Sequence, residues 1–97
     1  MTDAELRNLL IDCLRLWEVD GKVTVRDRDV AIQTSQGLFI VARADPDLRP
    51  VRWFYSTPER VSASRPPRAA PSIVALLSAL RNAMGGEGGD RLRVGAG

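Results

Sequence analysis

Hydrophobic residues recur every three or four positions near the N-terminus of the chain. Thr2 and Glu5 occupy the positions of a capping box, in which each side chain binds the backbone N–H of the other residue. The apolar positions that follow form one helical stripe: Leu6, Leu9, Leu10, Cys13, Leu14 and Trp17. This spacing predicts an amphipathic helix over residues 3–17, ended by Asp20 and Gly21.

The middle of the chain alternates with a period of two, which is typical of β-strands. Strands are predicted over residues 22–26, 30–34, 38–42 and 51–55, with Gly37 in a turn that favours positive φ. The first two are apolar on one face and the last two on both. In those last two strands, Leu38, Ile40 and Ala42 oppose Phe39 and Val41, and Val51, Trp53 and Tyr55 oppose Arg52, Phe54 and Ser56. A strand that is apolar on both faces needs a cover on both.

A second apolar stripe predicts a helix over residues 72–84, which Pro71 or Ser72 begins and Gly85-Gly86 ends. Residues 61–71 contain Pro66-Pro67 and are expected to form an extended linker. The order of elements predicts a two-layer α+β fold, α-β-β-β-β-α, with a four-stranded antiparallel meander flanked by the two helices. We expect a single domain over residues 1–84 and a flexible, glycine-rich tail over residues 85–97. The expected core consists of Leu6, Leu10, Leu14, Trp17, Val23, Val25, Ile32, Ile40, Trp53, Leu76, Leu77 and Leu80.

Composition indicates a small globular protein, because 44% of the 97 residues are hydrophobic and 27% are charged. Fourteen basic and twelve acidic residues give a formal charge of +2, which is too low to require a nucleic-acid partner. The charge is uneven: residues 1–50 carry −2 and residues 51–97 carry +4. Nearly all the basic residues are arginine, which indicates a GC-rich coding sequence such as many bacteria have.

The chain lacks the side chains that most catalytic and metal sites use. It has no histidine and a single cysteine, Cys13, which lies within the first helical stripe. The aspartate pairs Asp27/Asp29 and Asp45/Asp47 fall in predicted turns, where Asp binds backbone N–H groups. We therefore expect no enzyme, with no catalytic residue and no site for a cofactor or metal. Without a signal-like N-terminus or a membrane-length apolar run, we expect a cytoplasmic protein with no membrane contact.

The two-faced strands favour a protein-protein interaction, because two helices can cover one sheet face and leave the other open. We expect a homodimer, or a complex with another protein, through the following residues: Phe39, Val41, Arg52, Trp53, Phe54 and Tyr55. One alternative is a monomer with one helix on each face. Another is a protein that binds single-stranded nucleic acid through an arginine and aromatic sheet surface.

Overall fold

The computed structural model describes the backbone of residues 1–96 and the side chains of residues 1–85. Three helices, a short 3-10 helix and five strands follow one another along the chain. They are α1 (Asp3–Leu16), β1 (Gly21–Val25), β2 (Val30–Thr34), β3 (Gly37–Arg43), η1 (Pro46–Leu48), β4 (Trp53–Ser56), α2 (Pro58–Ser62), β5 (Arg68–Ala70) and α3 (Ile73–Ala96). The predicted α+β class, with N-terminal and C-terminal helices, is confirmed.

The five strands form one antiparallel meander, in which the order across the sheet equals the order along the chain. Four of them are the predicted strands: β2 has the predicted ends, and the ends of the other three are displaced by one or two residues. Three register pairs settle the faces: Ile32 lies opposite Phe39, Val41 opposite Tyr55, and Ala42 opposite Phe54. Because side chains alternate along a strand, Phe39 and Phe54 point to opposite sides of the sheet.

The first helix begins as its sequence predicts. The Thr2 hydroxyl accepts a hydrogen bond from the backbone N–H of Glu5 (3.1 Å), and the Glu5 carboxylate accepts one from the Thr2 N–H (3.1 Å). The side chains of Leu6, Leu10 and Leu14 are buried along one stripe of this helix. The capping box and the apolar stripe therefore fix both the start of α1 and the side that it turns to the sheet.

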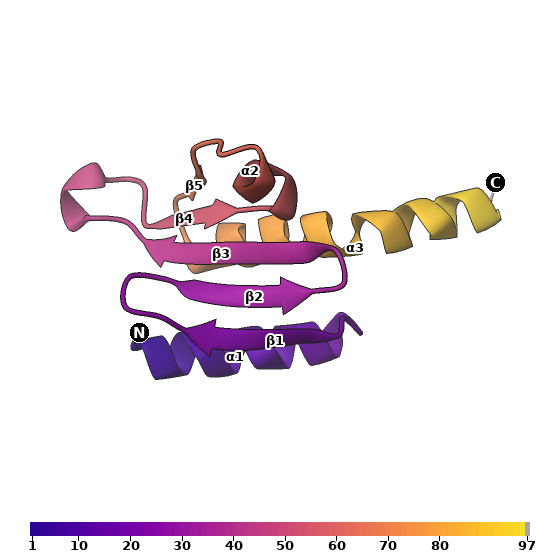
Figure 1. Ribbon diagram of the computed structural model, residues 1–97, viewed down its shortest axis with the longest axis horizontal. Coiled ribbons are helices and arrows are strands. Elements are labelled where there is room, and N and C mark those ends of the chain that lie inside the picture. Colours follow the sequence, from indigo (N-terminus) through magenta and orange to yellow (C-terminus); the bar gives the residue numbers. More distant parts are fainter. Residues whose placement is uncertain (97) are drawn as a thin grey trace.

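Both long helices pack on the same face of the sheet. Leu6 and Leu10 of α1 and Leu76 and Leu80 of α3 share one buried cluster with Phe39, and each is at most 1% exposed. In Figure 1 the two helices lie behind the strands, α1 beside β1 and α3 beyond β3 and β4. The opposite face of the sheet has no long helix against it. The arrangement with one helix on each face does not occur.

Most of the expected core is confirmed. Eight of the twelve residues are buried: Leu6, Leu10, Leu14, Val23, Ile32, Trp53, Leu76 and Leu80. Trp17 and Leu77 are partly buried against the same cluster. Val25 is 38% exposed at the end of β1. Ile40 is only partly buried, because its register opposite Ala31 and Ser56 places it on the face away from the helices.

The segment expected to be a linker is instead structured. It contains the end of α2 and the whole of β5, whose three residues pair with β4. The predicted end of the last helix also differs, because α3 continues past Met84 to Ala96. Most of the predicted tail, residues 85–97, lies outside the described side chains, and its flexibility stays a prediction.

Candidate partner-binding surface

The structure divides the six predicted partner-binding residues between the core and the surface. Phe39 and Val41 are 0% exposed and Trp53 is 8% exposed, all beneath the two long helices. A side chain enclosed in this way cannot contact a partner unless the domain opens. We therefore do not include these three in the candidate surface.

Phe54 is the predicted residue that the structure leaves on the open side of the sheet. It lies opposite Ala42 in β3 and opposite Ala69 in β5, and it is partly buried. Its neighbours on that side are Leu38 and Ile40, which are partly buried as well. We call Leu38, Ile40, Ala42 and Phe54 the open-face cluster. The six residues expected to bind a partner include Phe39 and Val41 together with Phe54, and the observed register places Phe54 on the other side of the sheet.

Polar residues border the open-face cluster. Lys22, Thr24 and Gln33 lie on the same side of β1 and β2 and are exposed. The cluster itself is centred on β3, the middle strand of the sheet. An apolar centre with a polar border is the usual composition of a protein interface.

The remaining two predicted residues lie toward the β5 edge. Tyr55 is partly buried against the core, opposite Arg68. Arg52 is exposed, and its backbone N–H donates a hydrogen bond to the carbonyl oxygen of Ala70 (3.0 Å). Arg52 precedes Phe54 by two residues, so both side chains belong to the open side of β4.

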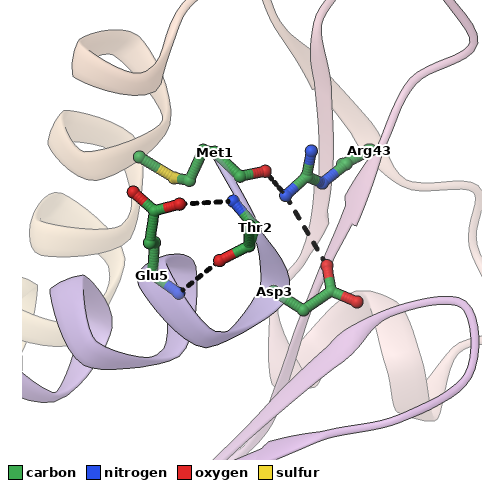
Figure 2. Close-up of polar contacts among 5 residues, drawn as sticks. All are labelled: Met1, Thr2, Asp3, Glu5 and Arg43. Carbon is green, nitrogen blue, oxygen red and sulfur yellow. Dashed lines mark hydrogen bonds and ion pairs between the residues drawn. The ribbon is translucent and has the colours of Figure 1, made fainter.

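Arg43 makes contacts that the sequence reading did not find. It lies opposite Trp53 in the register, and its guanidinium carbon is 5.6 Å from the centre of the indole ring. As Figure 2 shows, the same group donates to the carbonyl oxygen of Met1 and lies 3.6 Å from the Asp3 carboxylate. Strand alternation could have identified this residue, because Arg43 follows the buried Val41 by two positions on the helix side. Arg43 connects the end of β3 to the start of α1.

Three titratable groups have shifted pKa values, and none of them forms a reactive site. The side-chain hydrogen bond to Asp29 raises the pKa of the Arg26 guanidinium. The pKa of Glu5 is lowered, chiefly by its hydrogen bond from the backbone of Thr2, which stabilises the carboxylate. Burial raises the pKa of the Cys13 thiol, and the nearby Asp12 charge adds to this. A raised thiol pKa disfavours the nucleophilic thiolate.

The aspartates in the turns bind local backbone and side-chain groups. Asp45 accepts a hydrogen bond from the backbone N–H of Asp47 (2.9 Å). Asp29 accepts from the Arg26 guanidinium (2.9 Å) in the β1–β2 turn. Within residues 1–85, no three histidine, cysteine or carboxylate side chains are grouped as a metal site would require.

The exposed charge of the molecule is strongly positive around β4 and β5. From Arg49 to Arg81 the chain has six arginines and one carboxylate, Glu59, which gives a net charge of +5. Among the described side chains, neither Arg52 nor Arg68 has a carboxylate within 4.0 Å, because the two ion pairs found there involve Arg26 and Arg43. Uncompensated arginines of this kind attract anionic partners.

No helix in the described part of the chain is long and apolar enough to cross a membrane. Comparison of the chain with protein-family models, with curated proteins and with solved structures finds no match.

Proposed function

We propose that the protein is a non-catalytic module that self-associates through the open face of its sheet. The observation that carries the proposal is the placement of α1 and α3 on one side, which leaves the open-face cluster without a long helix against it. The five-residue helix α2 contacts β3 and β4. A helix of that length extends about 7–8 Å, so it can cover only one end of the face.

The β5 edge of the sheet is poorly suited to self-association. The edge strand β5 has only three residues, and proline lies on each side of it, at Pro67 and Pro71. Short strands, prolines and charged residues at an edge prevent pairing with a second sheet. Arg68 adds a positive charge within the strand. The open face is therefore favoured over the β5 edge as the surface for self-association.

A two-fold dimer suits the position of the cluster on β3. The same patch on both subunits is then buried, and the middle strands of the two copies cross near the symmetry axis. Ile40 lies at the centre of β3 and would contact its own copy across that axis. The sheets would pack about 10 Å apart, as the two sheets of a β-sandwich do.

Sedimentation velocity over a range of micromolar concentrations tests the proposal. We expect the wild type to dimerise and Ile40→Lys to be monomeric with an unchanged far-UV spectrum, because a lysine on the face places charge at the centre of the interface. Val74→Lys is the matched control, since Val74 is 69% exposed on α3 and lies outside the open-face cluster. A wild type that stays monomeric at 100 μM, or a dimer that Ile40→Lys leaves intact, would show the proposal to be wrong.

A further inference from the structure

A second feature of the molecule, which borders the open-face cluster at Phe54, is the basic end formed by β4, α2 and β5. Four exposed arginines define it: Arg49, Arg52, Arg65 and Arg68. The register places Arg68 opposite Tyr55, and the backbone of Arg52 contacts that of Ala70 at the other end of the β4–β5 pair. Arg52 and Tyr55 are three residues apart, so the two ends are separated by about 10 Å along the strand. Arg49 and Arg65 lie in the chain segments next to these ends.

The loop that carries two of these arginines is held to the neighbouring helix. The Arg60 guanidinium donates a hydrogen bond to the carbonyl oxygen of Pro66 (2.8 Å), and the Arg65 N–H donates to the Arg60 carbonyl (2.9 Å). Prolines at 66 and 67 restrict the backbone further. Arg65 and Arg68 are therefore presented from a constrained segment, which lowers the entropy lost when an anion binds.

An aromatic ring lies beside Arg52 on the open side of this basic end, whereas Arg68 shares the helix side of the edge strand β5 with Tyr55. Phe54 is partly buried on the open side of β4, two residues after Arg52 on the same side, and it lies opposite Ala69, whose small side chain cannot cover the ring. Proteins that bind single-stranded nucleic acid combine a positive surface that follows the phosphates with an aromatic side chain on which a base stacks. An acidic peptide would use the positive charge but gain little from the partly buried ring.

We propose that the basic end binds single-stranded nucleic acid that passes around the β5 edge, with the four arginines contacting phosphates and Phe54 stacking on a base. For single strands, the logarithm of the affinity falls by about 0.7 per phosphate contact for each tenfold rise in salt. Four contacts give a slope of about −3, so the affinity should fall about 50-fold between 50 and 200 mM salt.

Fluorescence anisotropy of a labelled twenty-nucleotide oligothymidylate tests the proposal. The measurements use the Ile40→Lys variant as well as the wild type, so that self-association does not cover Phe54. The triple variant Arg52→Gln, Arg65→Gln, Arg68→Gln leaves one of the four contacts, and its salt slope should fall to about −0.7. Phe54→Ala should weaken binding by about tenfold or more without changing the slope.

The control variant removes the same charge from the other half of the molecule: Arg7→Gln, Arg15→Gln, Arg28→Gln, all at exposed positions. It should bind like the wild type. Equal losses from both triple variants would overturn the proposal, since net charge alone would then explain binding. No binding at 50 mM salt would also overturn the proposal. The arginines would then serve only to prevent the edge strand β5 from pairing with a second sheet. Polyglutamate of equal length binding as tightly as the oligonucleotide would refute the assignment to nucleic acid. In the Ile40→Lys variant these outcomes do not depend on dimerisation, which sedimentation measures separately.

Discussion

Phe39 and Phe54 are phenylalanines on neighbouring strands whose rings lie on opposite sides of the sheet. Phe39 is 0% exposed beneath the two helices, whereas Phe54 is partly buried and faces away from them. Replacing each in turn by alanine removes the same atoms from two different environments. The comparison therefore tests the assignment of faces on which both proposals depend.

The expected costs follow from burial. A fully buried Phe→Ala change costs about 3–5 kcal/mol, because the lost burial is added to the cavity left behind. A domain of this size has a free energy of unfolding of about 5–15 kcal/mol, so Phe39→Ala should remove roughly a fifth or more of it. Phe54→Ala should cost about 1–2 kcal/mol in the monomer, since solvent can occupy the vacated space.

Urea denaturation measures the difference. With a dependence on urea of about 1–2 kcal/mol per molar, Phe39→Ala should lower the midpoint by about 2–4 M and Phe54→Ala by about 1 M. If Phe39→Ala does not fold, Phe39→Leu replaces it in the comparison, with an expected loss in the free energy of unfolding below about 1.5 kcal/mol. The loss at Phe54 should grow with protein concentration if the open face is buried in a dimer, and the loss at Phe39 should not. Equal losses in dilute solution, or an unchanged midpoint for Phe39→Ala, would refute the assignment of the faces.

Three further predictions concern the turns, the first helix and the cysteine. Gly37→Ala should destabilise the domain by about 1–3 kcal/mol, because Gly37 has φ 130° and an added Cβ would lie 2.9 Å from the Cβ of Pro58. Thermal unfolding measures this loss of stability, and an unchanged melting temperature would contradict the prediction. The lowered pKa of Glu5 means that its capping contact stabilises the fold above the ordinary value of 4.5 and is lost as pH falls through the lower folded value. Urea midpoints from pH 6 to 2 should therefore fall further for the wild type than for Glu5→Gln, which keeps the capping geometry; parallel curves would count against the contact. The Cys13 thiol should react with iodoacetamide more slowly in the folded protein than in urea, because burial raises its pKa, and equal rates would show that the site is open.

The sequence predicted most of the fold because its strongest signals are local. The capping box at Thr2 and Glu5 fixed the start of α1, and two-residue alternation located β1 to β4. The strand β5 was missed because three residues are too few to show a period, and the prolines nearby suggested a linker. The short helix α2 was missed for the same reason, since a five-residue segment has little more than one turn.

The candidate surface could not be located from the sequence with the same success. Alternation assigns Phe39 and Ile40 to different faces, but it does not say which face the helices cover. That choice depends on how the chain enters and leaves the sheet, which is a property of the whole fold. The register between β3 and β4 was also undetermined, because the connector that contains η1 allows several pairings. A shift of one residue moves Phe54 from one face to the other.

The strand order of the sheet has a consequence for how the chain assembles during synthesis. Each strand pairs with the one made just before it, so every addition to the sheet closes only a short loop. Proteins dominated by such near-neighbour contacts fold quickly. The last step is different, because Leu76 and Leu80 must return across the sheet to enclose Phe39. A nascent chain that stops before α3 should therefore hold a formed sheet whose helix side is covered only by α1. The apolar surface left uncovered there would be available to a chaperone or to a second nascent copy.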